Sequence, residues 1–262
     1  MAYKTLITSE QNGVFIITLN RPEKRNAISY ELIQDVLRAL EQAEKSSCQV
    51  LIVTANGKAF CAGMDLDDLK ALGAAKKTQV EHVEDSRTMA RLFRAIYDCP
   101  KPSIAAVNGA AIAGGTGIAT LCDITLAVPE AKFGYTEVRI GFVPAIVSTF
   151  LIRQVGEKQA RDLLLTGRLI DAAEAYRIGL INEVVASENL MSRAHEIASM
   201  LMENSPASVR ATKELLSKNV NAELDQQIEA AVEQNARMRL SHDFREGVSA
   251  FLEKRKPKWS GR

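Results

Sequence analysis

Apolar residues in the first half of the chain alternate between short runs of strand length and longer stretches with helical spacing. The dipeptide Asn12-Gly13 between two apolar runs predicts a hairpin, because both turn positions accept a positive φ angle. The expected strands are residues 5–9, 14–19, 50–54, 103–107 and 124–128. Helices are expected after a Ser29 cap, at residues 65–72 and within residues 76–97. Alternating strands and helices predict an α/β fold with helices packed outside a sheet.

Helical patterns dominate the chain beyond Pro144. The expected helices are residues 145–155, 158–165, 172–178, 189–202, 206–217, 224–239 and 242–254, and only residues 180–185 look extended. We therefore divide the chain into an α/β core domain, residues 1–200, and a helical C-terminal region, residues 201–262.

The composition is that of an ordinary globular protein, with 47% hydrophobic and 25% charged residues among 262. Lys and Arg (33) nearly balance Asp and Glu (32), so the formal net charge of +1 favours neither a nucleic acid nor a membrane surface as partner. The four cysteines and three histidines lack metal-ligand spacing, so we expect free thiols and no metal. No apolar run approaches the roughly 20 residues that span a bilayer, and no signal peptide is recognisable, so the expected location is the cytoplasm.

The segment AAVNGAAIAGGTGIATLCD, residues 105–123, is the most informative stretch for chemistry. It predicts a strand, a tight turn at Asn108-Gly109 and an apolar helix that begins at Gly114-Gly115. The first N–H groups of a helix have no partner within it, and glycines let a ligand approach them closely. This segment therefore predicts a site for an oxyanion, which indicates acyl or enolate chemistry.

Several segments in the same order and spacing closely resemble the crotonase family, the enoyl-CoA hydratases and isomerases. They are residues 20–27, 59–66, 106–123, 132–141, 165–167, 172–185 and 251–255. The resemblance implies a crotonase fold, in which repeated ββα units form the core and a helical C-terminal region mediates trimerisation. It also implies an acyl-CoA substrate, no separate cofactor because CoA enters as the thioester, and a homotrimer or homohexamer.

The resemblance assigns the oxyanion hole to the backbone N–H groups of Met64 and Gly114. Gly63 precedes the first donor and a predicted helix follows it, so backbone geometry can fix both donors. By the same resemblance, the residues that contact CoA are Lys24, Arg25, Ala27, Ala62, Asp65, Leu66, Phe251 and Lys254. Lys24 and Arg25 carry charges that suit phosphate groups. Walls of the acyl pocket are expected from residues 73–85 and from the C-terminal helices.

Family hydratases use two glutamates, and this chain matches one of them, Glu137. The other position is Gly117, which cannot transfer a proton. Taken by itself, Glu137 would be interpreted as an exposed acid at a strand end that pairs with Arg139. Beside the two oxyanion donors, we expect it to move a proton at the α-carbon. A single carboxylate also suits an isomerase that shuttles a proton between two carbons. Gly117 and residues 136–148 look most like hydratases of the methylglutaconyl-CoA type, so hydration is favoured and isomerisation is the alternative.

Three interpretations other than hydration and isomerisation are weaker. Aryl-CoA dehalogenases of this superfamily need an aspartate nucleophile where this chain has Ala145, which excludes that reaction. An RNA-binding role would need a basic helix, but residues 30–45 mix Glu31 and Asp35 with Arg38 and Lys45. A purely structural protein would have no need of two oxyanion donors facing a carboxylate.

Overall fold

The computed structural model describes residues 3–74 and 78–260, and within them the strands form two sheets. The larger sheet has six strands in the order β1-β2-β3-β5-β7-β10. These are β1 (Leu6–Gln11), β2 (Val14–Leu19), β3 (Val50–Ala55), β5 (Ser103–Val107), β7 (Ile124–Ala127) and β10 (Glu183–Val184). β1 and β2 are antiparallel, and the other neighbours are parallel. Asn12 (φ 52°) and Gly13 (φ 78°) form the turn of the predicted hairpin.

A smaller sheet of four described strands has the order β4-β6-β8-β9. Its members are β4 (Ala59–Cys61), β6 (Ala110–Ile112), β8 (Lys132–Gly134) and β9 (Ile170–Asp171). In three successive pairs, β3 with β4, β5 with β6 and β7 with β8, the first strand joins the large sheet and the second joins the small one. Each pair is followed by helix, so the predicted ββα repeat is confirmed.

The described helices of the N-terminal half are α1 (Tyr30–Lys45), α2 (Leu66–Ala74), α3 (Gln79–Tyr97) and α4 (Gly114–Thr120). Side-chain caps begin two of them, α1 and α3, whereas α4 has no side-chain cap. The Ser29 side chain accepts a hydrogen bond from the Leu32 N–H, as its sequence position predicts, and Thr78 forms a reciprocal capping box with Glu81. Residues 76 and 77, which the prediction placed within the range of the third of these helices, lie outside the described residues.

The C-terminal half is helical, as expected. Its described helices are α5 (Ala145–Thr166), α6 (Ala172–Arg177), α7 (Leu190–Met202), α8 (Pro206–Arg239) and α9 (His242–Leu252). Gly156 has non-helical angles (φ 75°, ψ 163°) inside α5, which separates the two helices predicted there. The prediction of two helices within residues 206–239 was wrong, because α8 continues through them as one helix of 34 residues.

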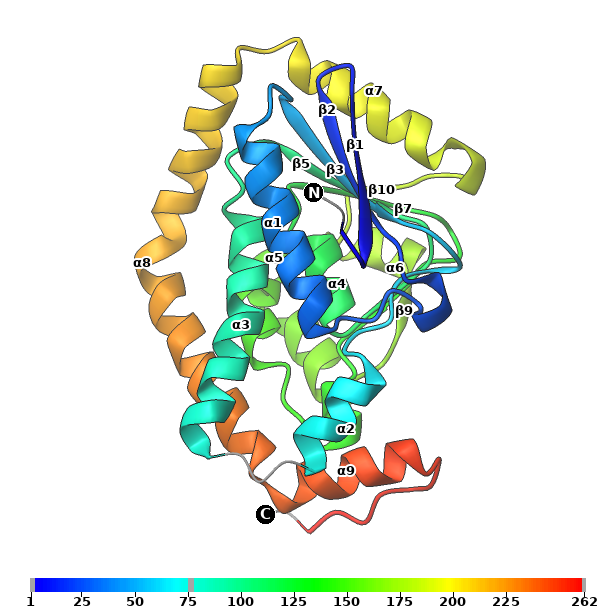
Figure 1. Cartoon of the computed structure of the whole chain (residues 1–262), viewed down its shortest axis with the longest axis vertical. Helices are drawn as coiled ribbons and strands as arrows, with labels where there is room; N and C mark the ends of the chain where they lie inside the picture. Colours follow the sequence, from blue (N-terminus) through cyan, green and yellow to red (C-terminus); the bar gives the residue numbers. More distant parts are fainter. Residues whose placement is uncertain (1–2, 75–77, 261–262) are drawn as a thin grey trace.

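Helices cover the sheets on several sides (Figure 1). α1 packs on β1 and β2, α7 packs on β3, β5 and β7, and α4 contacts strands of both sheets. α8 runs along one side of the molecule beside α3 and links α7 at one end to α9 at the other (Figure 1). All positions of β3 and β5 are buried, as is typical of parallel strands covered on both faces.

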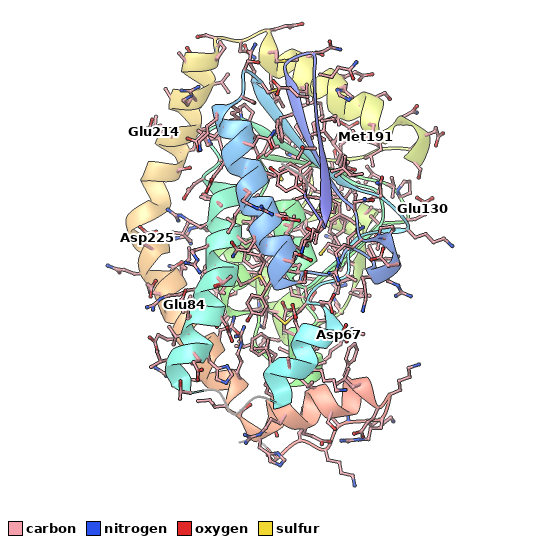
Figure 2. All side chains as sticks on the ribbon, viewed as in Figure 1. Asp67, Glu84, Glu130, Met191, Glu214 and Asp225 are labelled. Atoms are coloured by element: carbon pink, nitrogen blue, oxygen red, sulfur yellow. The ribbon has the colours of Figure 1, made fainter. Side chains whose placement is uncertain are left out.

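Charged side chains lie on the outer faces of this arrangement, as Asp67, Glu84 and Asp225 illustrate (Figure 2). Among the described helices, none is both long and apolar enough to cross a membrane.

Candidate active site

A cavity of about 520 Å³ opens between α2, α3, the first turn of α4, the start of α5, and the last turns of α8 and α9. A short 3-10 helix, η2 (Glu137–Ile140), forms one wall. The lining is mainly apolar and includes Ile28, Leu69, Phe93 and Val147. All three predicted catalytic residues, Met64, Gly114 and Glu137, line this one cavity.

Met64 lies at a turn whose geometry is fixed by its neighbours. Gly63 has φ 89°, a left-handed angle that favours glycine. Ile28 donates its N–H to the Gly63 carbonyl at 2.7 Å and accepts from the Asp65 N–H at 2.8 Å, so hydrogen bonds hold the chain on both sides of Met64. Within the described chain, no backbone carbonyl accepts the Met64 N–H.

Gly114 is the first residue of α4, so its N–H has no acceptor within the helix. The preceding residue, Ala113, has φ 52° and ψ −123°, a rare conformation for a residue with a side chain. A hydrogen bond of 2.7 Å from the Ala113 N–H to the Gly134 carbonyl holds it in place. Strained backbone of this kind persists only where its surroundings determine it, and here it directly precedes the Gly114 N–H.

The two turns touch each other. A Cβ atom on Gly63 would lie 3.1 Å from the Ile112 carbonyl oxygen and 3.3 Å from the Ala113 Cβ. A Cβ atom on Gly115 would lie 2.3 Å from the Cys61 carbonyl oxygen. Glycine at both positions is therefore required for the close approach of the two segments that carry the N–H groups.

Glu137 is the first residue of η2 and faces the same cavity. Its Oε2 atom is buried and has no hydrogen-bond partner in the described chain. Burial raises the pKa of this carboxyl from 4.5 to about 7, opposed by a hydrogen bond from its own backbone N–H. Both protonation states are thus accessible near neutral pH, as proton transfer in both directions requires. A buried oxygen without a partner does not fit the alternative of a surface acid paired with Arg139.

The position of the second family glutamate is closed by packing. A Cβ atom on Gly117 would lie 3.0 Å from Val147 Cγ1 and 3.1 Å from Phe93 Cε1. Gly117 itself does not line the cavity. A side chain at this position would therefore require Val147 and Phe93 to shift.

Sequence reasoning missed two polar residues of the cavity, Asn235 and Arg239 of α8. Both side chains are buried. Burial lowers the pKa of Arg239, and the nearby Asp85 carboxylate opposes that shift. A signal for them exists in the sequence. Leu224, Ile228 and Val232 form a buried stripe at helical spacing, and positions 235 and 239 continue that stripe with polar side chains.

Comparison with known proteins identifies the family. The model of the enoyl-CoA hydratase/isomerase family matches residues 9–262. The chain belongs to this family. The resemblance read from the sequence is therefore confirmed at the level of the family.

Full-length relatives support this membership. A Thermus thermophilus protein, provisionally named enoyl-CoA hydratase, is 42% identical over 258 residues, which cover 97% of this chain and 100% of the relative. The 2,3-dehydroadipyl-CoA hydratase of Escherichia coli is 34% identical, with 98% of this chain and 99% of that protein covered. The crystal structure of an enoyl-CoA hydratase/isomerase from Pseudoalteromonas atlantica has a TM-score of 0.87 at 33% identity, covering 98% of this chain and 100% of that one. The crotonase fold predicted from the sequence is confirmed.

The segment predicted to contact CoA is anchored beside the Met64 turn. Arg21 donates to the Ala27 carbonyl at 3.0 Å and to the Asp65 carboxylate at 2.9 Å. Ala62 donates its N–H to the Arg25 carbonyl at 3.0 Å. The buried Asp65 carboxylate is thus held in an internal ion pair with Arg21, and its negative charge rules it out as a direct partner of a phosphate.

Lys24 and Arg25 are both exposed on this segment. Lys24 Nζ pairs with the Asp67 carboxylate at 3.0 Å, and both side chains are accessible to water, so this pair is weak and exchangeable. Arg25 has φ 51°, which turns the chain at the surface. Neither residue lines the cavity.

Leu66 and Phe251 lie at the mouth of the cavity, where both are about half exposed (50% and 51%). They come from α2 and α9, which pack against each other. Lys254 follows α9 with φ 55°, is exposed, and does not line the cavity. The C-terminal helices thus form part of the wall, as expected. The described part of residues 73–85 does not line the cavity. The first residue of α3 that does so is Met89, one helical turn beyond residue 85.

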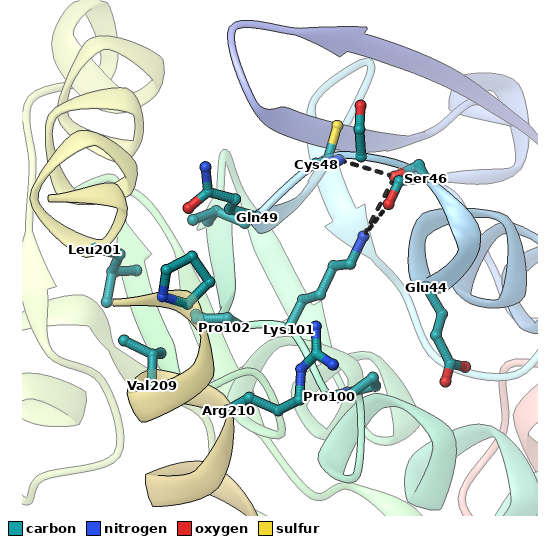
Figure 3. Close-up of a pocket in the computed structure, with 13 residues that line it drawn as sticks. Glu44, Ser46, Cys48, Gln49, Pro100, Lys101, Pro102, Leu201, Val209 and Arg210 are labelled. Atoms are coloured by element: carbon teal, nitrogen blue, oxygen red, sulfur yellow. Dashed lines mark hydrogen bonds between the residues drawn. The ribbon is translucent and has the colours of Figure 1, made fainter. Parts of the chain in front are cut away.

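A second hollow of about 220 Å³ carries no comparable chemistry (Figure 3). Lys101 lies in it, but its ammonium group donates to the carbonyls of Ala43 and, at 2.8 Å, Ser46. These carbonyls end α1, so Lys101 serves as a helix cap. Elsewhere in the described chain, no group of three or more His, Cys, Asp or Glu side chains is placed to hold a metal ion.

Proposed function

We propose that the protein is an enoyl-CoA hydratase, which adds water across the 2,3 double bond of an enoyl-CoA thioester. The observation that carries this proposal is that Met64, Gly114 and Glu137 line a single, mainly apolar cavity, where the two N–H groups have no backbone acceptor in the described chain and Glu137 Oε2 is buried without a partner. The N–H groups suit a thioester oxygen that gains negative charge, and the carboxyl suits proton transfer beside it.

In the proposed mechanism, Glu137 serves both as base and as acid. Its carboxylate takes a proton from water as the water oxygen bonds to C3 of the enoyl group. Electrons of the double bond move to the thioester oxygen, and the Met64 and Gly114 N–H groups stabilise the resulting enolate, each by about 3 kcal/mol. Glu137 then delivers the proton to C2, which restores the thioester and completes the addition of one water molecule.

This use of one carboxyl agrees with the packing around Gly117, where a Cβ atom would already lie 3.0 Å from Val147 and 3.1 Å from Phe93. The raised pKa of Glu137, about 7, supports alternation between the two protonation states. An isomerase also uses a single carboxyl, but the hydratase names of the relatives favour hydration.

Finer assignments belong to the same proposal. The contacts to CoA come from the segment with Lys24, Arg25 and Ala27, from the backbone around Ala62, and from the mouth residues Leu66 and Phe251 with Lys254 nearby. Asp65 contributes indirectly, through its ion pair with Arg21, because its N–H already donates to the Ile28 carbonyl.

The branched substrate of the methylglutaconyl-CoA type, the domain boundary at residue 200 and the cytoplasmic location stay predictions from the sequence. Assembly as a homotrimer or homohexamer rests on the family resemblance, and light scattering on the purified protein measures it. A monomer at micromolar concentration would contradict it.

The test of the proposed function is an assay with crotonyl-CoA, 3-hexenoyl-CoA and methylglutaconyl-CoA, with products separated by chromatography. We expect 3-hydroxyacyl-CoA products from crotonyl-CoA. Migration of the 3-hexenoyl double bond without any hydration of crotonyl-CoA would establish the isomerase instead. Retention on immobilised CoA, compared with single-stranded RNA in a salt series, separates both enzymes from a nucleic-acid-binding protein.

A further inference from the structure

The acyl cavity contains polar groups that the proposed mechanism does not use. Arg239 is 4% exposed and Asn235 is 6% exposed, and both line the cavity. The Nε and Nη1 atoms of Arg239 and the Oδ1 atom of Asn235 are buried without a hydrogen-bond partner. The two residues are four positions apart on α8, so they share one face of the helix.

The surrounding side chains satisfy the charge and the N–H donors of Arg239 only in part. Its Nη1 atom lies 3.4 Å from the Asp85 carboxylate, close enough for an ion pair but outside hydrogen-bonding geometry. Asp85 also accepts a hydrogen bond from the Tyr30 hydroxyl. The guanidinium carbon lies 5.7 Å from the centre of the Phe142 ring. Donors left unpaired in such an apolar site are costly, so a native ligand is expected to satisfy them.

We propose that Arg239 and Asn235 bind a carboxylate carried by the acyl group, so that the preferred substrate is the CoA monothioester of an unsaturated dicarboxylic acid. This inference rests on the proposed function, because the cavity must receive an enoyl-CoA. Guanidinium groups are well suited to carboxylates, since their N–H bonds match both oxygens. The Asn235 amide adds an N–H donor when it turns about its last torsion.

Arg239 can serve a substrate carboxylate while Asp85 stays in place. Arg168 of the same protein binds two carboxylates at once, those of Asp162 at 2.6 Å and Glu174 at 2.7 Å. A guanidinium has five N–H bonds, so one carboxylate does not exhaust it. A methyl-terminated acyl chain in the same place would leave the buried donors unsatisfied, which disfavours it.

The first test needs no variant and no turnover. Calorimetry compares the binding of two saturated thioesters of equal chain length, adipyl-CoA and hexanoyl-CoA, to the full-length protein. We expect adipyl-CoA to bind about 10- to 100-fold more tightly, as charge-assisted hydrogen bonds allow. The adipyl-CoA monoamide, which has the same shape without the charge, should bind at least about fivefold more weakly than adipyl-CoA. Equal affinity of adipyl-CoA and hexanoyl-CoA, or of the acid and its amide, overturns the inference.

The second test assigns the effect to the residues. Hydration of the CoA monothioester of 2-hexenedioic acid is compared with that of 2-hexenoyl-CoA. Arg239→Gln should lower kcat/KM for the diacid substrate about 10- to 100-fold and change that for 2-hexenoyl-CoA little. Arg237→Gln, the same change at an exposed position of the same helix turn, should keep the preference of the unmodified protein.

The outcomes separate the inference from the proposed function. Binding that favours adipyl-CoA, with no hydration of any enoyl-CoA, refutes the function and leaves the carboxylate site standing. Hydration without preference for the diacid refutes the carboxylate site alone. An equal loss with both substrates in Arg239→Gln shows that Arg239 only ties α8 to the core, which also overturns the inference. Asn235→Leu, which keeps Arg239, should reduce the preference for the diacid substrate several-fold. It provides a second test if Arg239→Gln does not fold.

Discussion

Glu137→Gln removes an ionisable group from the cavity while nearly preserving the shape of the side chain. Folding raises the pKa of Glu137 from 4.5 to about 7, so the folded protein holds this proton more tightly than the unfolded chain does. The stabilising effect of the bound proton is complete below pH 4.5 and is lost as the pH rises through about 7. Glutamine cannot lose a proton, so the variant should not show this loss.

The magnitude follows from the same two values. One proton changes the free energy of unfolding by about 1.4 kcal/mol per pH unit, and the interval from 4.5 to about 7 is about 2.5 pH units. Above pH 8, Glu137→Gln should therefore be more stable than the unmodified protein by on the order of 3 kcal/mol. At pH 4.5 the two should differ little.

Thermal unfolding at several pH values between 4.5 and 8.5 measures this difference. For a chain of this size we expect the Tm of the variant to exceed that of the unmodified protein by about 6–12 °C at pH 8. Turnover of crotonyl-CoA should fall at least about 100-fold with little change in KM. Glu188→Gln, at an exposed glutamate, is the control and should leave both properties unchanged. A variant that keeps near-normal turnover, or gains no stability at alkaline pH, would refute the role and burial assigned to Glu137.

Three further changes test other parts of the site and its support. Gly63→Ala should reduce kcat at least about tenfold, because it shifts the adjacent Met64 N–H. The control Gly179→Ala, at φ 78° with no close neighbour, should lower the free energy of unfolding by about 1 kcal/mol and leave kcat unchanged. Equal kcat values in the two variants would contradict this. Gly117→Glu should lower the free energy of unfolding by about 1–3 kcal/mol, because its Cβ would lie 3.0–3.2 Å from an aromatic ring and a valine methyl, and it should not raise the rate of hydration. A stable variant with faster hydration would show that the missing acid limits the rate. Lys101→Met should cost about 2 kcal/mol in chemical denaturation with unchanged KM, and unchanged stability would disprove its capping role.

Local signals made much of the fold predictable. Asn12 and Gly13 specify the hairpin turn, Ser29 caps α1, and Gly156 marks a break between helical segments. Each of these effects depends on a few neighbouring residues, so it can be read from the sequence. The small sheet could not be read in this way. Its strands have only two or three residues, and pairing between distant segments determines them.

The site was predictable where backbone geometry determines it. Gly63 and Gly114 mark turns that expose N–H groups, and the family resemblance then directed attention to Glu137. The polar residues of α8 were missed, because a polar side chain within an amphipathic helix usually faces water. Asn235 and Arg239 continue the apolar stripe of α8, but that position becomes informative once tertiary packing places this face of the helix in the core.

The cavity draws its wall from Ile28 near one end of the sequence and from Phe251 near the other. A growing polypeptide on the ribosome therefore cannot complete the wall until α8 and α9 have emerged and docked. Until then, the apolar surface that will receive the acyl group faces water, where it is prone to aggregation. Formation of the cavity is thus coupled to the synthesis and docking of α8 and α9.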